Sequence, residues 1–441
     1  MPDLVVVVPG IMGSVLKRGN RVVWDTSVVT AARGILDFQT VVSALALPER
    51  LGDDAPDPAH VLEPAGLLRG WHLMPGAGSG RGYLGMVKQL RLLGPEPLRV
   101  AEFAYDWRLS NRYTARRLKR FTESALEQWQ DTRRDPDARV VFVCHSMGGL
   151  VARHYVNQLG GHELCRRVIT IGTPYSGSVN TVRTLTGGSW MPDRLVAAAR
   201  TMPALHQLLP SFACVRTPQG PATLAAAPLP GIEPWMAADA ADLHEQGHTR
   251  HGTPLHVFAG WRHNTRAGVE ITPDGFDYRW TWPKTGAQGV VAERDLSGDG
   301  TVPRFAAIPP EWADDTAVAY RPVRHSEQPE DPDLVQSVWA KIENLTPQTF
   351  MDTDTDLGVD IPEYVPPGEP VVVRARAGAP DLKVVVTATS LRSPTDAQTA
   401  EADPDGAGGY LARLALGPGV WHVAVRVVGQ PSASGDLVLV G

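Results

Sequence analysis

Short runs of apolar residues recur along the first 345 residues, and stretches with helical spacing separate them. Residues Leu4–Val8 form a continuous apolar run that ends at Pro9 and Gly10. Such a run predicts a strand buried on both faces, as in a parallel sheet. Similar runs occupy residues 98–105, 140–144, 166–174 and 254–261. One separating stretch repeats apolar residues at helical spacing, at Leu118, Phe121, Ala125 and Trp129. This alternation predicts an α/β domain with a parallel sheet over residues 1–345.

Two long stretches interrupt the alternation. Residues 46–80 and 216–252 are rich in Pro, Gly and Ala and show no regular apolar period. Long irregular insertions in a compact enzyme often form a lid or cap over the site. They are also compatible with plain surface loops, and the sequence leaves the two interpretations open.

The pattern changes after residue 345. Residues 346–368 are acidic and contain several prolines, which predicts a linker. Residues 369–441 consist of short runs of alternating apolar and polar residues, separated by Gly, Pro and Asp. This texture predicts a small β-sandwich domain.

Composition and charge exclude several classes of protein. Of the 441 residues 43% are hydrophobic, enough for a large core, so the chain is not expected to be disordered. The net charge of -6 argues against a nucleic-acid-binding protein, which is usually basic. A basic helical patch (Arg116, Arg117, Lys119, Arg120) could touch anionic lipid transiently, although a solvated helix face is the favoured interpretation.

The cysteines and the apolar segments predict the compartment. Cys144, Cys165 and Cys214 cannot form a disulfide framework, and no pair has the spacing of a metal site. A reducing environment fits this best. The first residues lack a basic region and a long apolar run, and no stretch approaches the roughly 18 apolar residues of a membrane span. We therefore expect a cytoplasmic protein with no metal and no cofactor.

The stretch VVFVCHSMGGLVARHYV, residues 140–156, predicts a strand, a sharp turn at Ser146 and a helix. This is the form of a nucleophile elbow, Gly-x-Ser-x-Gly, except that Cys144 occupies the first glycine position. A cysteine is small and behaves as a hydrophobe, so we expect it to be tolerated there. A redox or nucleophilic role for Cys144 is disfavoured, because cysteines inside strands are usually buried and inert.

Two further residues complete a candidate catalytic set. Asp299 lies in LSGDGTVP and His325 in YRPVRHSEQPED, which gives the chain order Ser146, acid, His expected of an α/β-hydrolase. A serine hydroxyl needs a base to become a nucleophile at neutral pH, and His325 would serve as that base. Asp299 would fix the tautomer of the imidazole and stabilise its protonated form.

An oxyanion hole is also required. One donor would be the backbone N–H of Met147, and the second the N–H of Ile11 in the loop after the first strand, with Met12 as the near alternative. The segment around Asp299 also resembles the opening of a calcium loop, but Ala306 stands at the twelfth position, where a bidentate Glu is needed. The calcium interpretation is therefore set aside.

With these motifs the sequence resembles the lecithin:cholesterol acyltransferase family of α/β-hydrolase lipases. The matching blocks are VVPGIMGSVL (7–16), YDWRLS (105–110), CHSMGGLVARHY (144–155), VITIGTPYSGS (168–178), MPALHQLLP (202–210) and GDGTVP (298–303), followed by His325. The resemblance implies Ser146 as nucleophile, Asp299 as acid, His325 as base, and Ile11 and Met147 as oxyanion donors. It also implies that residues 216–252 are the lid candidate, and we expect Arg108 of the DWR block to have a structural role.

The expected function is that of a serine hydrolase or acyltransferase on lipid esters, phospholipid or acylglycerol, through an acyl-enzyme on Ser146. The alternative is a catalytically idle hydrolase fold that recruits a partner through its C-terminal β domain. For that domain, membrane or partner targeting is possible, and a stabilising or oligomerising role is the favoured interpretation. The sequence does not identify a protein partner.

Overall fold

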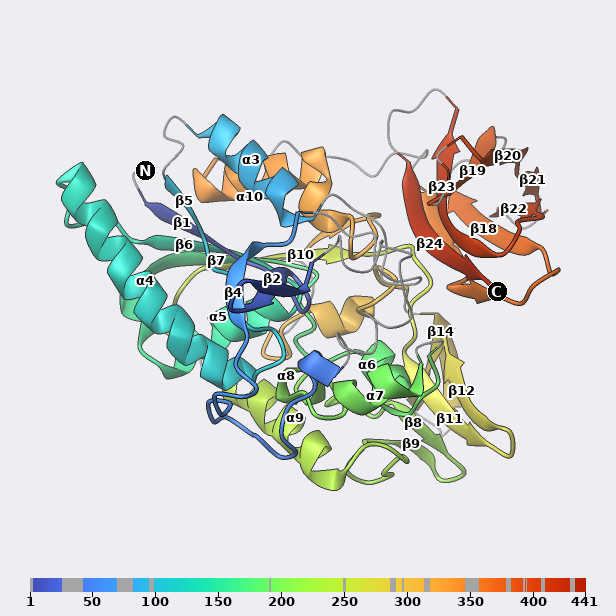
Figure 1. The fold of residues 1–441 in the computed structure, drawn as a ribbon, viewed down its shortest axis with the longest axis horizontal. Coiled ribbons are helices and arrows are strands. Elements are labelled where there is room, and N and C mark those ends of the chain that lie inside the picture. Colours follow the sequence, from blue (N-terminus) through green and yellow to red (C-terminus); the bar gives the residue numbers. More distant parts are fainter. Residues whose placement is uncertain are drawn as a thin grey trace.

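The computed structural model describes most of the chain: residues 3–25, 43–69, 82–94, 99–189, 192–248, 251–285, 291–295, 297–312, 318–345, 357–377, 382–391, 393, 395–405, 409–428 and 433–441. A large α/β part carries the central sheet, and a separate all-β unit lies at one end of it (Figure 1). The predicted α/β class with a C-terminal β domain is confirmed.

The centre of the large part is a six-stranded parallel sheet in the order β15-β10-β7-β6-β1-β5. Its strands are β1 (Leu4–Val8), β5 (Val100–Glu102), β6 (Val140–His145), β7 (Cys165–Ile171), β10 (Leu255–Gly260) and β15 (Val318–Arg321). Every residue of β1 and β6 is buried, as a sheet covered on both faces requires. The five predicted strands are all present, and the four-residue β15 was missed.

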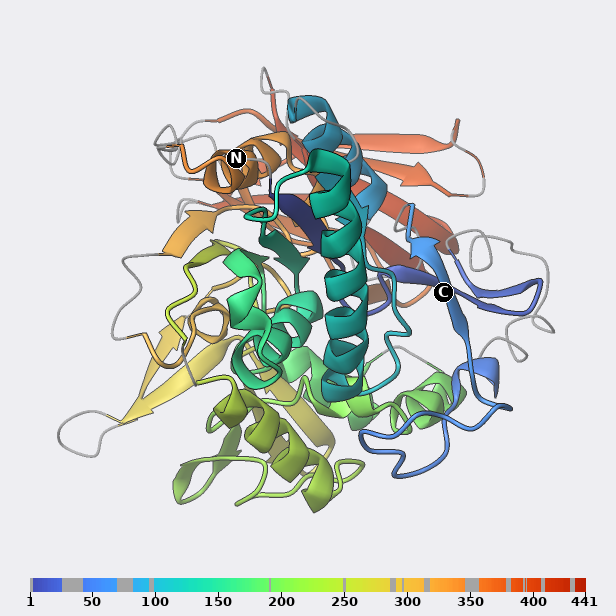
Figure 2. The same cartoon turned by 90° about the vertical axis from the view of Figure 1, so that its left-hand side faces the viewer.

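Helices cover both faces of this sheet. Helices α3 (Tyr83–Leu93) and α10 (Pro332–Ile342) lie on one face, and α4 (Asn111–Arg133) and α5 (Met147–Gln158) on the other (Figures 1 and 2). Helix α4 begins where the Ser110 hydroxyl accepts the N–H groups of Arg112 and Tyr113, a cap that typically contributes about 1 kcal/mol. Its buried stripe includes the predicted Leu118 and Trp129.

A second group of elements lies beside the carboxyl ends of the sheet strands. It contains α6 (Val179–Leu185), α7 (Asp193–Ala199), α8 (Pro203–His206), α9 (Pro234–Gln246) and a four-stranded sheet, β12-β11-β8-β9. The sheet strands are β8 (Val215–Thr217), β9 (Gly220–Ala222), β11 (Gly268–Thr272) and β12 (Gly275–Arg279). The insertion 216–252, for which the sequence showed no regular period, therefore contains a hairpin and a 13-residue helix.

The first insertion is described over residues 46–69, and its remainder lies outside the described residues. It carries β4 (Glu63–Leu67), which pairs with β2 (Ser14–Arg18), while β2 also pairs with β3 (Arg21–Trp24). An extra two-stranded ribbon of β13 (Thr281–Thr285) and β14 (Val291–Asp295) follows β12 in the chain, and its first strand contacts β11. Whether either insertion works as a lid stays a prediction.

The C-terminal unit consists of two sheets packed around their own core. One has the order β16-β18-β22-β21 and the other β17-β24-β23-β19-β20. The strands are β16 (Leu357–Asp360), β17 (Tyr364–Val365), β18 (Val371–Ala377), β19 (Val384–Ser390), β20 (Ala397–Glu401), β21 (Asp403–Pro404), β22 (Gly409–Leu414), β23 (Gly419–Val427) and β24 (Ser434–Val440). The end of the expected linker 346–368 thus supplies β16 and β17, because its apolar residues Leu357, Val359 and Val365 join the core of the unit.

Among the described residues, no helix combines the length and the apolarity that crossing a bilayer would need.

Arg108 joins the first insertion to the body of the protein. Its guanidinium is fully buried and binds Asp106 through two bonds, Nε to Oδ1 at 2.9 Å and Nη2 to Oδ2 at 2.6 Å. It also donates to the carbonyl oxygens of Ala44, Leu45 and His60 at 3.2, 3.3 and 2.9 Å. One side chain therefore satisfies a buried carboxylate and three separate backbone groups.

We expect Arg108→Met to lower the free energy of unfolding by about 3–5 kcal/mol, because it leaves the buried Asp106 carboxylate without its partner. Urea denaturation followed by circular dichroism measures this. The matched control is Arg117→Met on the exposed face of α4, which should change stability by less than about 0.5 kcal/mol. Equal effects of the two substitutions would contradict the structural role of Arg108.

Candidate active site

Ser146 lies at the turn between β6 and α5 in a strained conformation. Its φ is 52° and its ψ is -129°, a left-handed region that L-residues rarely adopt. Two glycines allow the turn. A Cβ at Gly148 would lie 2.5 Å from the carbonyl oxygens of Val8 and Pro9, and one at Gly149 would lie 2.0 Å from Thr173 Oγ1. Only glycine therefore lets the helix approach the loop after β1 this closely.

Cys144 occupies the strand side of the turn and is fully buried in β6. Burial raises the pKa of its thiol well above the usual value, and the nearby Cys165 adds to this. A buried thiol that stays protonated is a packing residue and a poor nucleophile. The departure from the glycine of the elbow motif therefore leaves the turn intact.

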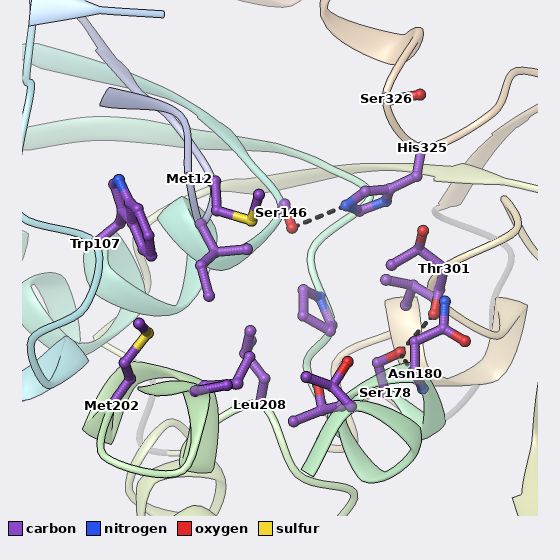
Figure 3. A pocket seen from close by; sticks show the side chains of 18 of the residues that line it. Met12, Trp107, Ser146, Ser178, Asn180, Met202, Leu208, Thr301, His325 and Ser326 are labelled. Atoms are coloured by element: carbon purple, nitrogen blue, oxygen red, sulfur yellow. Dashed lines mark hydrogen bonds between the residues drawn. The ribbon is translucent and has the colours of Figure 1, made fainter. Parts of the chain in front are cut away.

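The structure brings the side chains of Ser146, His325 and Asp299 together. His325 Nε2 lies 2.9 Å from Ser146 Oγ (Figure 3). On the other side of the ring, His325 Nδ1 lies 2.7 Å from Asp299 Oδ2. The Asp299 carboxylate oxygen can only accept, so Nδ1 carries the proton and Nε2 is left to accept from the serine hydroxyl. This is the arrangement in which a histidine can act as a base toward a serine.

Asp299 is buried and held in its ionised form. Burial raises the pKa of its carboxyl. The charge and hydrogen bond of His325 and the N–H groups of Val302 and Thr301 together lower the pKa by more than burial raises it, so the net shift is downward. The two N–H groups lie 2.7 and 3.0 Å from Oδ1. Gln328 Nε2 donates to Oδ2 at 3.1 Å. Nothing in the sequence marks Gln328 as a partner of Asp299.

His145 and Tyr83 form a second network, which the sequence analysis missed. Tyr83 Oη accepts the N–H of Gly10 at 2.8 Å and lies 2.7 Å from His145 Nδ1. His145 Nε2 lies 2.9 Å from the carbonyl oxygen of His325. Because that carbonyl can only accept, His145 carries its proton on Nε2, and its Nδ1 accepts a hydrogen bond from the Tyr83 hydroxyl.

The pKa of His145 fits this assignment. Burial lowers it to about 3, and the nearby His325 contributes in the same direction. The ring is therefore neutral at physiological pH and links the loop after β1 to the loop that carries His325. The position of His145 beside the nucleophile was visible in the sequence, but nothing there marked Tyr83 as its partner.

The two expected oxyanion donors border the nucleophile. Met147 is the first residue of α5, so its N–H has no acceptor within the helix. Ile11 and Met12 both line the cavity beside Ser146. Met12 has a φ of 64°, which turns the chain there. The N–H of Gly10 is already donated to Tyr83, so within this loop Ile11 and Met12 remain the candidates.

A cavity of about 280 Å³ opens at Ser146 and His325. One side is apolar, and Figure 3 shows Met12, Trp107, Met202 and Leu208 around it. The other side is polar, formed by Ser178, Asn180, Thr301 and Ser326. The described residues that line the cavity include none from 46–80 or 216–252, and much of its wall comes from α6, α7 and α8 instead. The site thus offers an apolar chamber and a polar wall on either side of the serine.

Over the described part of the chain, no group of three or more His, Cys, Asp or Glu residues could hold a metal ion. Asp299, which also belongs to the calcium-loop pattern in the sequence, is hydrogen-bonded to His325.

We expect Tyr83→Phe to slow the reaction of Ser146 with a fluorophosphonate by about tenfold. It should also lower the free energy of unfolding by about 1–3 kcal/mol, because the Gly10 N–H and His145 Nδ1 lose their hydrogen-bond partner inside the protein. A time course of fluorophosphonate labelling measures the reaction rate, and urea denaturation measures the stability. Tyr113→Phe, a tyrosine on α4, is the matched control. A Tyr83→Phe variant that labels at the wild-type rate would show that the network does not support the serine.

Comparison with known proteins finds a family match over part of the chain. The family model of lecithin:cholesterol acyltransferase matches residues 76–226, and no curated protein matches. Among solved structures, the mature form of the lipase BlEst2 from Bacillus licheniformis is 13% identical, with a TM-score of 0.38, over 77% of this chain and 91% of that one. The phospholipase PlaB from Legionella pneumophila is 11% identical, with a TM-score of 0.29, over 99% and 92%. The family match confirms the resemblance indicated by the motifs: over residues 76–226 this chain matches the lecithin:cholesterol acyltransferase family.

Proposed function

We propose that this protein is a serine hydrolase or acyltransferase that acts on lipid esters through an acyl-enzyme on Ser146. The observation that carries the proposal is the continuous hydrogen-bond path from Ser146 Oγ through His325 to the buried, ionised Asp299. The family match over residues 76–226 supports the ester of a lipid as the class of substrate.

The contacts support a two-step reaction. His325 Nε2 takes the hydroxyl proton as Ser146 Oγ attacks the ester carbonyl, and the oxygen of the tetrahedral intermediate is held by the N–H groups of Met147 and Ile11, with Met12 as the alternative to Ile11. The protonated His325 gives its proton to the departing alcohol, which leaves an acyl group on Ser146. Water or a second alcohol then attacks that acyl group and loses its proton to His325. His325 returns this proton to Ser146 Oγ as the bond between the acyl group and Ser146 Oγ breaks, which releases a fatty acid or a new ester and restores the serine.

The cavity supports a substrate with an apolar chain and a polar remainder. The apolar side around Trp107, Met202 and Leu208 would bury an acyl chain, and each buried CH₂ contributes about 0.8 kcal/mol. The polar side around Ser178 and Asn180 would face the alcohol portion of a phospholipid or acylglycerol. Since water reaches an open cavity readily, we propose hydrolysis as the main outcome, with transfer when an acceptor alcohol is bound.

A cytoplasmic location belongs to the same proposal, on the basis of three free, buried cysteines. Transient contact with an anionic membrane surface would involve Arg116, Arg117 and Arg120, which lie exposed on α4.

The test is product analysis by mass spectrometry. Purified protein is incubated with mixed phospholipids, acylglycerols and a long-chain alcohol, and Ser146→Ala should reduce product formation by more than about 10³-fold. Free fatty acid would identify a hydrolase, and an ester of the added alcohol an acyltransferase. The lipid that is consumed in the reaction would identify the substrate.

Ser124→Ala, on the exposed face of α4, is the matched control and should retain wild-type activity. Full activity in Ser146→Ala would refute the acyl-enzyme. A wild-type protein that forms no product and does not react with a serine-directed phosphonate would instead support a binding protein on a hydrolase fold.

A further inference from the structure

The C-terminal β unit contacts the loop that carries His325 directly, and it reaches the loop that carries Asp299 through His263. We propose that this unit is a positioning element of the active site, in which strands β16 and β24 hold those two loops in the geometry that catalysis needs. The inference rests on the proposed function of Asp299 and His325. It gives the β unit a role inside the catalytic site, in place of a role in targeting alone.

Three consecutive residues of β24 hold the histidine loop. Asp436 Oδ2 lies 2.5 Å from Arg324 Nη2, and the two side chains are only 2% and 12% exposed. Glu327 accepts the N–H of Gly435 at 2.7 Å and the hydroxyl of Ser434 at 3.1 Å. Arg324 and Glu327 stand on either side of His325, so the loop is fixed at both flanks.

Strand β24 is itself well anchored. Its residues Ser434–Val440 pair with β23 along their whole length, including Gly435 with Ala424 and Asp436 with Val423. The partners offered to the histidine loop therefore belong to a sheet, which resists displacement better than a mobile tail would.

Strand β16 holds the aspartate loop through His263. The backbone of His263 pairs with Gly298, next to Asp299, with N···O distances of 3.1 and 3.0 Å. His263 Nδ1 accepts the N–H of Val359 in β16 at 3.2 Å, and Arg324 Nη1 donates to the Val359 carbonyl at 3.3 Å. Val359 is thus hydrogen-bonded to the histidine loop directly and linked to the aspartate loop through His263.

The chain between β16 and β17 also enters the wall of the cavity. Glu363 lines the cavity, and its Oε2 lies 2.5 Å from Nη1 of Arg183, another lining residue, on α6. Its Oε1 lies 3.4 Å from Arg266 Nη1, and Arg266 in turn contacts Asn180 Oδ1 at 3.3 Å. A carboxylate of the β unit therefore organises the polar side of the cavity.

These contacts matter because the Asp299 and His325 loops contain little regular structure. A displacement of about 1 Å in a catalytic group can cost about 10²-fold in rate. If the β unit only stabilised the fold, weakening its contacts would lower the unfolding midpoint and leave turnover of the folded protein unchanged. If it positions the loops, turnover falls while the protein remains folded.

The experiment compares full-length variants on a soluble p-nitrophenyl ester of a short fatty acid. We expect Glu327→Ala/Asp436→Ala to lower kcat by about tenfold or more with KM within about twofold of wild type, because the loops and not the cavity lose their support. Glu327→Gln should retain most of the activity, since its amide oxygen still accepts the Gly435 N–H. The control is Lys383→Ala/Glu401→Ala, which removes an exposed ion pair elsewhere in the β unit.

Hydrogen exchange of residues 321–328 supplies a readout that does not require turnover. We expect faster exchange in Glu327→Ala/Asp436→Ala than in wild type or in the control. If wild type shows no Ser146-dependent turnover, the proposed function fails, and the exchange data still decide whether β24 holds the loop. If the double variant does not fold, Asp436→Asn and Ser434→Ala are assessed in the same two ways.

Three results would overturn the inference. One is an unchanged kcat and exchange rate in the folded variants, which would leave the β unit as packing alone. Another is a rise in KM without a change in kcat, which would place its effect on substrate binding. The third is a higher kcat, which would mean that the unit restrains the site.

The contact should also depend on pH. Burial raises the pKa of Glu327 from 4.5 to about 7, and Asp436 adds to the rise, although Arg324 and the Gly435 and Ser434 hydrogen bonds oppose it. Between about pH 4.5 and 7 the folded chain therefore binds more protons than the unfolded chain, so stability falls as pH rises across this interval.

Glutamine at position 327 does not titrate, so the urea midpoint of wild type should fall relative to that of Glu327→Gln as pH rises from about 5 to 8. Denaturation at several pH values measures the difference. Glu401→Gln, at an exposed position, should follow the wild-type profile. A constant difference between wild type and Glu327→Gln would contradict the raised pKa.

Discussion

The close approach of α5 to the loop after β1 is the constraint on which the site depends. Neither Gly148 nor Gly149 has room for a side-chain carbon, because carbonyl oxygens of Val8 and Pro9 and the side chain of Thr173 occupy that space. The helix can therefore begin directly at the end of β6, with Ser146 in its strained conformation. Packing holds Ser146 in this strained conformation, because β1 and β6, which precede the loop and the helix, are fully buried.

Backbone groups of the site loops are fixed together with the side chains. The carbonyl oxygen of His325 accepts a hydrogen bond from Nε2–H of His145, and the N–H of His325 donates to the carbonyl oxygen of Asp299 at 2.9 Å. The N–H of Gly10 is held by Tyr83 on the other side of the serine. A neutral histidine and a tyrosine thus join the loop of the proposed oxyanion donor Ile11 to the loop of the proposed base His325, and electrostatic preorganisation of this kind is usually a large contribution to catalysis.

Much of the fold and part of the site could be predicted from the sequence, because the signals were local. The apolar run Leu4–Val8 and the elbow around Ser146 each carry their own pattern, and chain order linked Ser146 to Asp299 and His325. Tyr83, Gln328 and the contacts of β24 carried no such signal, because each becomes relevant only when residues far apart in the chain meet. The same holds for β16 and β17. Their segment is acidic and contains prolines, which predicts a linker, and only the folded structure shows that its few apolar residues belong to the core of the β unit.

The ion pair between Arg324 and Asp436 joins residues that are 112 positions apart. During synthesis the α/β part emerges first, and domains tend to fold as they emerge, at about 5–20 residues per second. The histidine loop must then remain without its partners for several seconds while the β unit is still being made. With the proposed role of β24, the assembly of a competent site would follow the order of translation, and it would be complete only when the last strand of the β unit has paired.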